Sequence, residues 1–159
     1  MARITIDDCA ASQAPARLIR RIDRLMRSVV EARFSTSDLS FSQWIALKLV
    51  LDGMVSTPGE LARELGHNTG AVTRLIDALE NRGLLRRERL ATDRRAIDLV
   101  TTAEGREQVN KLADIVVDTW NEVLADIDEM EFDVFMRALR KLQIAAQRKA
   151  SSLEEFEEA

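Results

Sequence analysis

Residues that could bind a phosphate backbone and read base edges gather in the middle of the chain. Thr69 and Gly70 stand where a helix would begin, so their N–H groups and the helix dipole would favour a phosphate. Asn68, just before them, is a candidate N-cap for that helix. One turn further on, Thr73 and Arg74 supply a short and a long donor, and an arginine can bond a guanine bidentately. These residue types at this spacing are typical of a surface that binds double-stranded DNA.

Two short helices with a tight turn between them must position these residues. The first begins at Thr57, because Thr57 with Glu60 three residues later forms a capping box, and Pro58 suits the first helical position. Gly66 can end this helix. The second helix follows Asn68 and carries apolar residues at i, i+3, i+4 and i+7, which predicts one buried stripe. A turn containing glycine between two such helices is the helix-turn-helix pattern. The stripe consists of Val72, Leu75, Ile76 and Leu79.

A β-hairpin is predicted directly after the second helix. Its outward strand carries Arg86 and Arg87, its tip covers residues 91–95, and its return strand covers residues 96–100. Residues 55–56 could form a very short strand against it.

The tip of this hairpin is basic. An arginine on a projecting tip fits a narrow minor groove, where the negative potential is enhanced. Asp93 could hold a neighbouring arginine by a charge-assisted hydrogen bond. Arg94 and Arg95 would then divide two tasks, one paired with Asp93 and one in the groove.

The stretch from residue 57 to residue 101 resembles the winged helix of the MarR family of bacterial transcriptional regulators. Each matching residue carries little weight alone, but their order and spacing together are specific. The likeness covers about residues 39–105 by motif, and the remainder only by helical layout. One departure is Thr101, where the family usually has leucine, so weaker local packing is expected there. The matching residues are Leu39-Ser40, Gln43-Trp44, Leu61-Ala62, Val72-Thr73-Arg74-Leu75-Ile76-Asp77, Leu79-Glu80, Gly83-Leu84, Arg87, Asp93-Arg94-Arg95, Thr102 and Gly105.

The resemblance implies a mainly α protein with a small β-hairpin wing, built of a winged helix-turn-helix lobe and a helical dimerisation lobe. An N-terminal arm and dimerisation helix would occupy residues 1–38, the DNA-binding lobe residues 39–101, and the C-terminal dimerisation helices residues 102–159. The implied function is a ligand-responsive repressor that binds a palindromic operator as a homodimer. The alternative is a winged-helix module that binds a protein partner and no DNA.

The expected DNA contacts divide by role. Thr73 and Arg74 would read bases, and Arg94 and Arg95 would form the wing contact, with the family pattern Asp-x-Arg favouring Arg95 in the groove. For Arg87 two interpretations stay open, because it would either contact a phosphate or pair with an acidic side chain such as Glu80 or Glu88. The residues expected to hold the DNA backbone are Asn68, Thr69, Gly70 and Arg87.

Helices are also predicted on both sides of this lobe. Ser40 and Gln43 form a capping box that opens a helix over residues 41–52. Apolar residues at helical spacing predict a first helix from about residue 16 and two long helices after Thr102. A single copy would expose a large apolar surface on these terminal helices, which marks an association site. In MarR-like proteins they interlock as a two-fold dimer, with two recognition helices in successive major grooves about 34–36 Å apart.

Charge and composition limit the class of protein. The net charge is −4, but acidic residues outnumber basic ones only after residue 101, so we expect salt-sensitive DNA binding that relies on a dimer. Hydrophobic content of 46% and charged content of 31% are globular values. No apolar run approaches membrane-spanning length. A single cysteine and no visible secretory signal predict a cytoplasmic protein without an intramolecular disulfide.

The resemblance further implies a small effector. Relatives often bind aromatic or phenolic anions between the dimer helices and the winged lobe. For each candidate residue the alternative is a structural one, with the tryptophans in the core and the basic side chains in solvent. The candidate walls are Arg24, Arg27, Trp44, Lys48 and Trp120.

Neither Cys9 nor His67 indicates a redox sensor or a metal site. Some relatives sense oxidants through an N-terminal cysteine, but Cys9 lies beside Asp7 and Asp8, whose charges disfavour the thiolate that a sensor needs. His67 is the only histidine and lacks the companions that a zinc site requires. We therefore expect no metal, no cofactor and no enzymatic activity.

Overall fold

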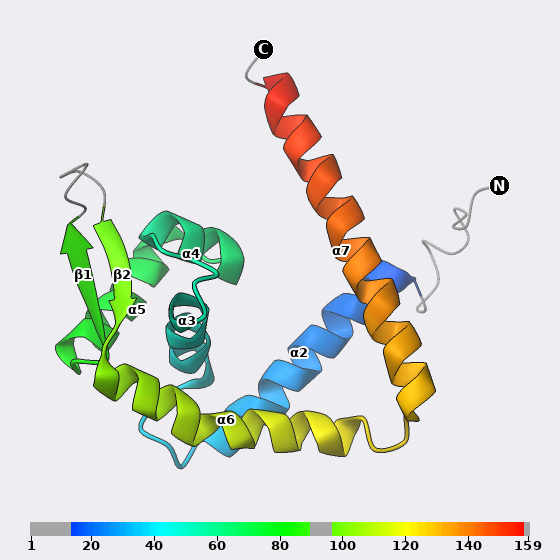
Figure 1. Ribbon diagram of the computed structural model, residues 1–159, viewed down its shortest axis with the longest axis horizontal. Helices are drawn as coiled ribbons and strands as arrows, with labels where there is room; N and C mark the ends of the chain where they lie inside the picture. The colour runs from blue at the N-terminus through cyan, green and yellow to red at the C-terminus, as the bar shows by residue number, and fades with distance from the viewer. Residues whose placement is uncertain (1–13, 90–96, 158–159) are drawn as a thin grey trace. The chain divides into compact units, whose positions relative to one another are not determined.

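The computed structural model describes residues 14–89 and 97–157, with side chains as far as residue 152 (Figure 1). The chain divides into two compact units, Met1–Thr119 and Trp120–Ala159. The described elements are α2 (Pro15–Phe34), α3 (Phe41–Leu51), α4 (Pro58–Leu65), α5 (Thr69–Asn81), β1 (Leu85–Arg89), β2 (Ile97–Thr101), α6 (Ala103–Val123) and α7 (Glu129–Glu157).

Local capping explains where the helices of the first unit begin. Ser40 opens α3 with a capping box, in which its hydroxyl accepts from the Gln43 N–H and the Gln43 side chain accepts from the Ser40 N–H. Thr57 and Glu60 form the same arrangement at α4, with Pro58 at its first position. The Asn68 side chain caps α5 by accepting from the Ala71 N–H at 2.8 Å. The capping predictions are thereby confirmed.

Gly66 gives α4 its abrupt end. It has φ of +62°, in the left-handed region that glycine enters without a steric penalty. The chain then reverses, and the His67 N–H donates to the Ala62 carbonyl at 3.0 Å. This turn brings α4 and α5 together as a helix-turn-helix pair.

The hairpin pairs β1 and β2 antiparallel, from Leu85 opposite Thr101 to Arg89 opposite Ile97. β1 packs against α5, and β2 packs against α3 and α4 (Figure 1). Residues 55–56 do not form the short strand that was expected. One backbone hydrogen bond takes its place, from the Leu99 N–H to the Ser56 carbonyl at 2.7 Å. The predicted tip at residues 91–95 lies outside the described residues.

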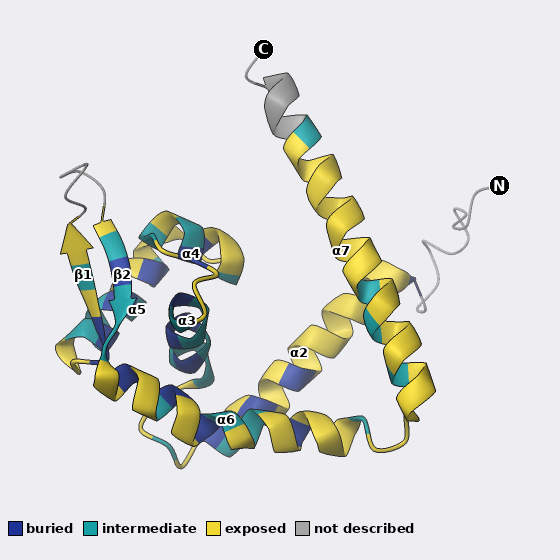
Figure 2. Ribbon diagram, in the orientation of Figure 1, coloured by how far each residue is buried: buried dark blue, intermediate teal, exposed yellow. Residues whose placement is uncertain are grey.

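A core of mainly aliphatic side chains joins the end of α2, α3, α4, α5, the hairpin and the first half of α6 (Figure 2). Leu47, Leu61, Ile76 and Leu79 are fully buried in it. At one side, Phe34, Phe41 and Trp44 contact one another with ring centroids 5.5–6.1 Å apart. Of the predicted α5 stripe, Val72, Ile76 and Leu79 are buried and Leu75 is half-buried, so the periodicity identified the buried face correctly.

A tight joint connects the hairpin to α6. The Thr102 N–H donates to the Leu84 carbonyl at 3.1 Å, and the Thr102 hydroxyl donates to the Gly83 carbonyl at 2.7 Å. The same hydroxyl accepts from the Gly105 N–H at 3.0 Å, so Thr102 caps the start of α6. A Cβ on Gly105 would lie 2.0 Å from the Leu84 carbonyl oxygen, so only glycine fits at this approach. Thr101, the departure from the MarR pattern, uses its hydroxyl to donate to the Leu47 carbonyl at 3.3 Å.

The second unit consists of the end of α6, a turn and the long helix α7. Asp128 and Glu131 cap α7 reciprocally, with the Glu131 N–H on Asp128 at 2.8 Å. α7 is exposed along most of its described side chains (Figure 2). Neither this helix nor any other in the described part of the chain is long and apolar enough to cross a membrane.

Candidate nucleic-acid interface

The exposed face of α5 carries the residues predicted to contact DNA. Thr69, Gly70, Thr73 and Arg74 are all exposed, while the opposite face of the helix is buried in the core. The helix begins at Thr69, so the free N–H groups of its first turn lie beside the outward-facing side chains. Arg74 makes no hydrogen bond or ion pair with the described part of the chain, which leaves its guanidinium available for a ligand.

Two of these side chains already have a partner within the helix. The Asn68 side-chain oxygen accepts from the Ala71 N–H, so only its amide NH₂ remains to donate to a phosphate. The Thr73 hydroxyl donates to the Thr69 carbonyl at 2.9 Å. Its lone pairs and methyl group stay exposed, so Thr73 can still accept from a base or contact a thymine methyl.

Arg87 is held by two acidic side chains of α5. Its Nη2 lies 2.6 Å from Asp77 Oδ1, and its Nη1 lies 2.5 Å from Glu80 Oε2. Its backbone N–H donates to Glu80 Oε1 at 3.1 Å. Hydrogen bonding to Asp77, and then to Glu80, raises the pKa of Arg87 above its ordinary value. Of the two interpretations of Arg87, the structure contains the acidic pairing, and the phosphate contact stays a prediction.

The other basic side chains of β1, Arg86 and Arg89, lie nearer to solvent than Arg87. Arg86 pairs with Glu88 on its own strand at 2.6 Å, with both side chains about half exposed. Such an exposed pair contributes little stability, about 0–1 kcal/mol. Arg94 and Arg95 belong to the segment 90–96 outside the described residues, so their wing contact stays a prediction, as does the role of Asp93.

The predicted effector residues have diverse surroundings. Trp44 is buried, and its indole N–H donates to the Val109 carbonyl at 3.0 Å. Arg27 pairs with Asp23, and Lys48 pairs with Asp52. Trp120 is 38% exposed in the second unit. These environments match the structural interpretation for Trp44 and leave effector binding by the others as a prediction.

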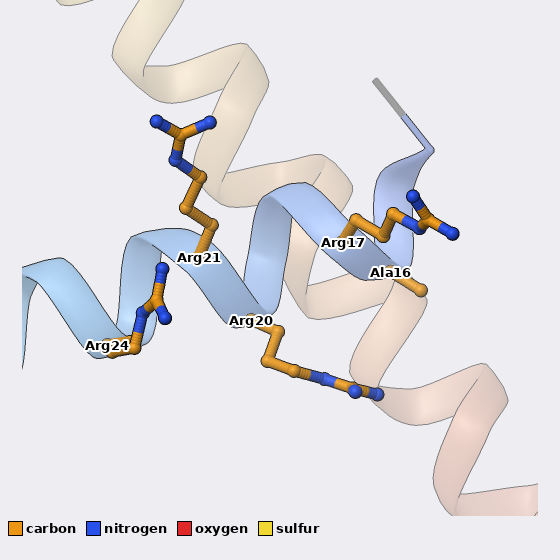
Figure 3. A pocket seen from close by; sticks show the side chains of 5 residues that line it. All are labelled: Ala16, Arg17, Arg20, Arg21 and Arg24. Carbon is orange, nitrogen blue, oxygen red and sulfur yellow. The ribbon is translucent and has the colours of Figure 1, made fainter. Parts of the chain in front are cut away.

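Arg24 lines a shallow hollow of about 380 Å³ along α2, together with Ala16, Arg17, Arg20 and Arg21. Figure 3 shows that the guanidinium groups of these arginines spread in different directions and do not converge on one point. The hollow is a basic helix face and not a formed ligand pocket. Among the described residues, no group of three histidine, cysteine, aspartate or glutamate side chains could hold a metal ion.

Asp77 is the residue whose role the sequence did not disclose. From the sequence it was known only as a residue that matches the MarR pattern, yet it binds the guanidinium of Arg87 from a position one turn beyond Arg74. Two acids three residues apart on a helix, followed by an arginine on the next strand, would have been the available indication. Pairing across seven and ten residues depends on the angle of the hairpin, which spacing alone does not give.

Comparisons with known proteins agree with this geometry. Residues 37–96 match the sequence model of the MarR family. The crystal structure of the transcriptional regulator PA3341 is 30% identical, with a TM-score of 0.73 over 84% of this chain and 98% of that chain. The chain belongs to the MarR family. It is a DNA-binding transcriptional regulator, and members of this family are not enzymes.

Two more distant structures have the same fold. A variant of E. coli MarR complexed with operator DNA is 22% identical, with a TM-score of 0.68 over 80% of this chain and 91% of that chain. BpsR of Bordetella bronchiseptica, whose DNA binding is regulated by 6-hydroxynicotinic acid, is 20% identical, with a TM-score of 0.70 over 83% and 94% of the two chains. The predicted mainly α fold with a hairpin wing is therefore confirmed.

Proposed function

We propose that this MarR-family regulator is a homodimeric, ligand-responsive repressor that binds a palindromic operator in the cytoplasm. The observation that carries the proposal is the exposed first half of α5, where free helix N–H groups, Thr73 and Arg74 share one surface. Within the described part of the chain, Arg74 has no hydrogen-bond or ion-pair partner. The MarR structure with operator DNA supports a DNA ligand for this surface. Asn68, Thr69 and Gly70 position the phosphate backbone, and Arg94 and Arg95 form the wing contact.

Base reading by Arg74 can be tested directly. The wild-type protein selects duplexes from a random library, and the selected duplex is titrated in a gel-shift assay. Arg74→Ala should cost about 1–3 kcal/mol of binding free energy and relax the preference at one position of each half-site. Arg63→Ala on α4 removes the same charge from another exposed site and serves as the control. An Arg74→Ala protein with unchanged affinity and preference would remove Arg74 from the interface.

Dimerisation is proposed for the terminal helices. α2 exposes Leu18, Ile19, Ile22, Leu25 and Val29, which a monomer would leave in water. We assign residues 1–38 and 102–159 to the dimerisation parts and residues 39–101 to the DNA-binding lobe. A two-fold axis through these helices would present two α5 helices to successive major grooves about 34–36 Å apart.

The proposed effector is a small aromatic acid. BpsR, with 6-hydroxynicotinic acid, supplies the precedent for the chemical class. A ligand of this kind relieves repression only if it binds better to a dimer whose α5 spacing does not match the operator. A panel of aromatic acids should include one that raises the melting temperature and weakens the gel shift. A compound that raises the melting temperature and leaves operator affinity unchanged would be a ligand but not an inducer.

A further inference from the structure

We propose that Arg87 is a positioning residue, which keeps Asp77 and Glu80 on α5 from opposing DNA binding and holds the wing against that helix. The inference rests on the proposed DNA-binding surface of α5. It assigns to Arg87 a task that is separate from a phosphate contact, and it gives the two acids of this helix a function.

The geometry uses both arms of the guanidinium. Nη2 binds Asp77 and Nη1 binds Glu80, while the backbone N–H of the same residue binds the second carboxylate oxygen of Glu80. Three hydrogen bonds thus connect one residue of β1 to two successive turns of α5. The planar fork of arginine fits this arrangement, whereas a lysine ammonium would lack its fixed geometry. The Arg87 side chain is 27% exposed, so the pair is shielded more than an ordinary surface pair.

Asp77 is the acid that matters for DNA. It lies three residues after Arg74 and four after Thr73, so all three side chains project from neighbouring positions on one side of the helix. Its side chain is 49% exposed. Without Arg87, an unpaired carboxylate there would repel the phosphates and compete with DNA for the guanidinium of Arg74. Arg87 neutralises this charge and leaves Arg74, which has no partner among the described residues, available to DNA.

A double-mutant cycle separates this role from a direct phosphate contact. The variants are Arg87→Gln, Asp77→Asn and the double variant D77N/R87Q, which has the same net charge as the wild-type protein. Arg86→Gln is the matched control, because it removes the same charge from the neighbouring residue of β1, where Arg86 pairs with Glu88 and with no acid of α5 among the described residues. Each protein is titrated against the wild-type-selected duplex at several salt concentrations, and its fold is checked by circular dichroism and thermal melting.

The positioning role predicts about a tenfold loss of affinity for R87Q and recovery to within about threefold of wild type in D77N/R87Q. The dependence of affinity on salt should be the same for R87Q and R86Q. A direct phosphate contact predicts instead that D77N/R87Q stays as weak as R87Q, and that the salt slope falls by about one unit for each lost contact. That pair of results would overturn the inference.

Three further outcomes are also decisive. If R87Q does not fold, D77N/R87Q is compared with R86Q, and weaker binding by the double variant overturns the inference. If the wild-type protein selects no duplex at low salt, the proposed function fails first. If it selects one and R87Q binds it as R86Q does, the inference alone fails.

Discussion

The hydroxyl of one residue, Thr102, connects the hairpin to the start of α6. The Thr102 hydroxyl donates to one chain segment and accepts from the next, so it connects Gly83 to Gly105 through one oxygen. This arrangement explains why the spacing from Thr102 to Gly105 carries information about the fold: the cap needs a hydroxyl, and the close approach needs a residue without a Cβ. The joint sets the direction in which α6 leaves the winged lobe.

Gly105→Ala should therefore destabilise the protein by about 1–3 kcal/mol, because the new methyl group overpacks a site that has no room for it. The added Cβ would lie 2.0 Å from the Leu84 oxygen and 2.9 Å from Thr101 Cγ2. Urea denaturation followed by circular dichroism measures the change. Gly59→Ala is the control, since nothing lies within 4 Å of a Cβ there, and its stability should be unchanged or higher by up to about 1 kcal/mol. Equal effects at the two sites would contradict the steric explanation.

At the scale of elements, what could be predicted depended on local interactions. The starts of α3, α4 and α5 and the end of α4 followed from residues within four positions of one another. The pairing of Arg87 with Glu80 was one of two open interpretations, but the bonds of Arg87 to Asp77 and of Thr101 to Leu47 were not predicted, because these partners are 10 and 54 residues away. The missing strand at residues 55–56 has the same cause: its contact with Leu99 depends on how the hairpin is placed. The residues of α5 that were predicted to contact DNA lie together on one exposed face. Their contacts with DNA stay a prediction.

The first turn of α5 allows helix capping to be separated from phosphate binding. Asn68→Ala removes the acceptor for the Ala71 N–H and should cost about 1 kcal/mol of stability. Asn68→Asp keeps that acceptor, so stability should be retained, but its negative charge would face the phosphate and weaken DNA binding. Thermal melting and gel-shift titration of both variants test this. If Asn68→Asp bound DNA as well as the wild-type protein, Asn68 would be a cap and no more.

The stability that Glu60 gives to the start of α4 should decrease at acid pH. The pKa of Glu60 is lowered by hydrogen bonds from the Ser56 and Thr57 N–H groups, so folding favours its charged form. This stabilisation is complete above the ordinary glutamate pKa and is lost as the pH falls through the lowered value. The stability difference between wild type and Glu60→Gln should therefore be largest near neutrality and shrink in that acid range. Glu64→Gln, an exposed change on the same helix, is the control, and a pH-independent difference for Glu60→Gln would refute the linkage.

At the scale of the whole molecule, the charge and the apolar surface both favour a dimer. The net charge is −4, and the winged lobe itself has only a small basic excess, so one copy would have a weak electrostatic attraction to DNA. Two copies on one operator double the phosphate contacts and require matched spacing of the two α5 helices. In the proposed dimer, the residues that join the copies would therefore control affinity, although they are not expected to touch DNA.

Introducing charges into the exposed apolar face of α2 tests this dependence. Ile22 and Leu25 are 47% and 51% exposed in the single chain, so I22E/L25E should leave the fold of the winged lobe intact while making an apolar interface between copies unfavourable. Sedimentation equilibrium should give a monomer mass, and the gel shift with the selected duplex should be lost at salt concentrations where wild type binds. Met54→Glu places a charge on an apolar residue that is 67% exposed outside the helices and should keep the wild-type mass. An I22E/L25E protein that remains dimeric would place the interface on another surface, and a monomer with full operator affinity would show that each winged lobe binds independently.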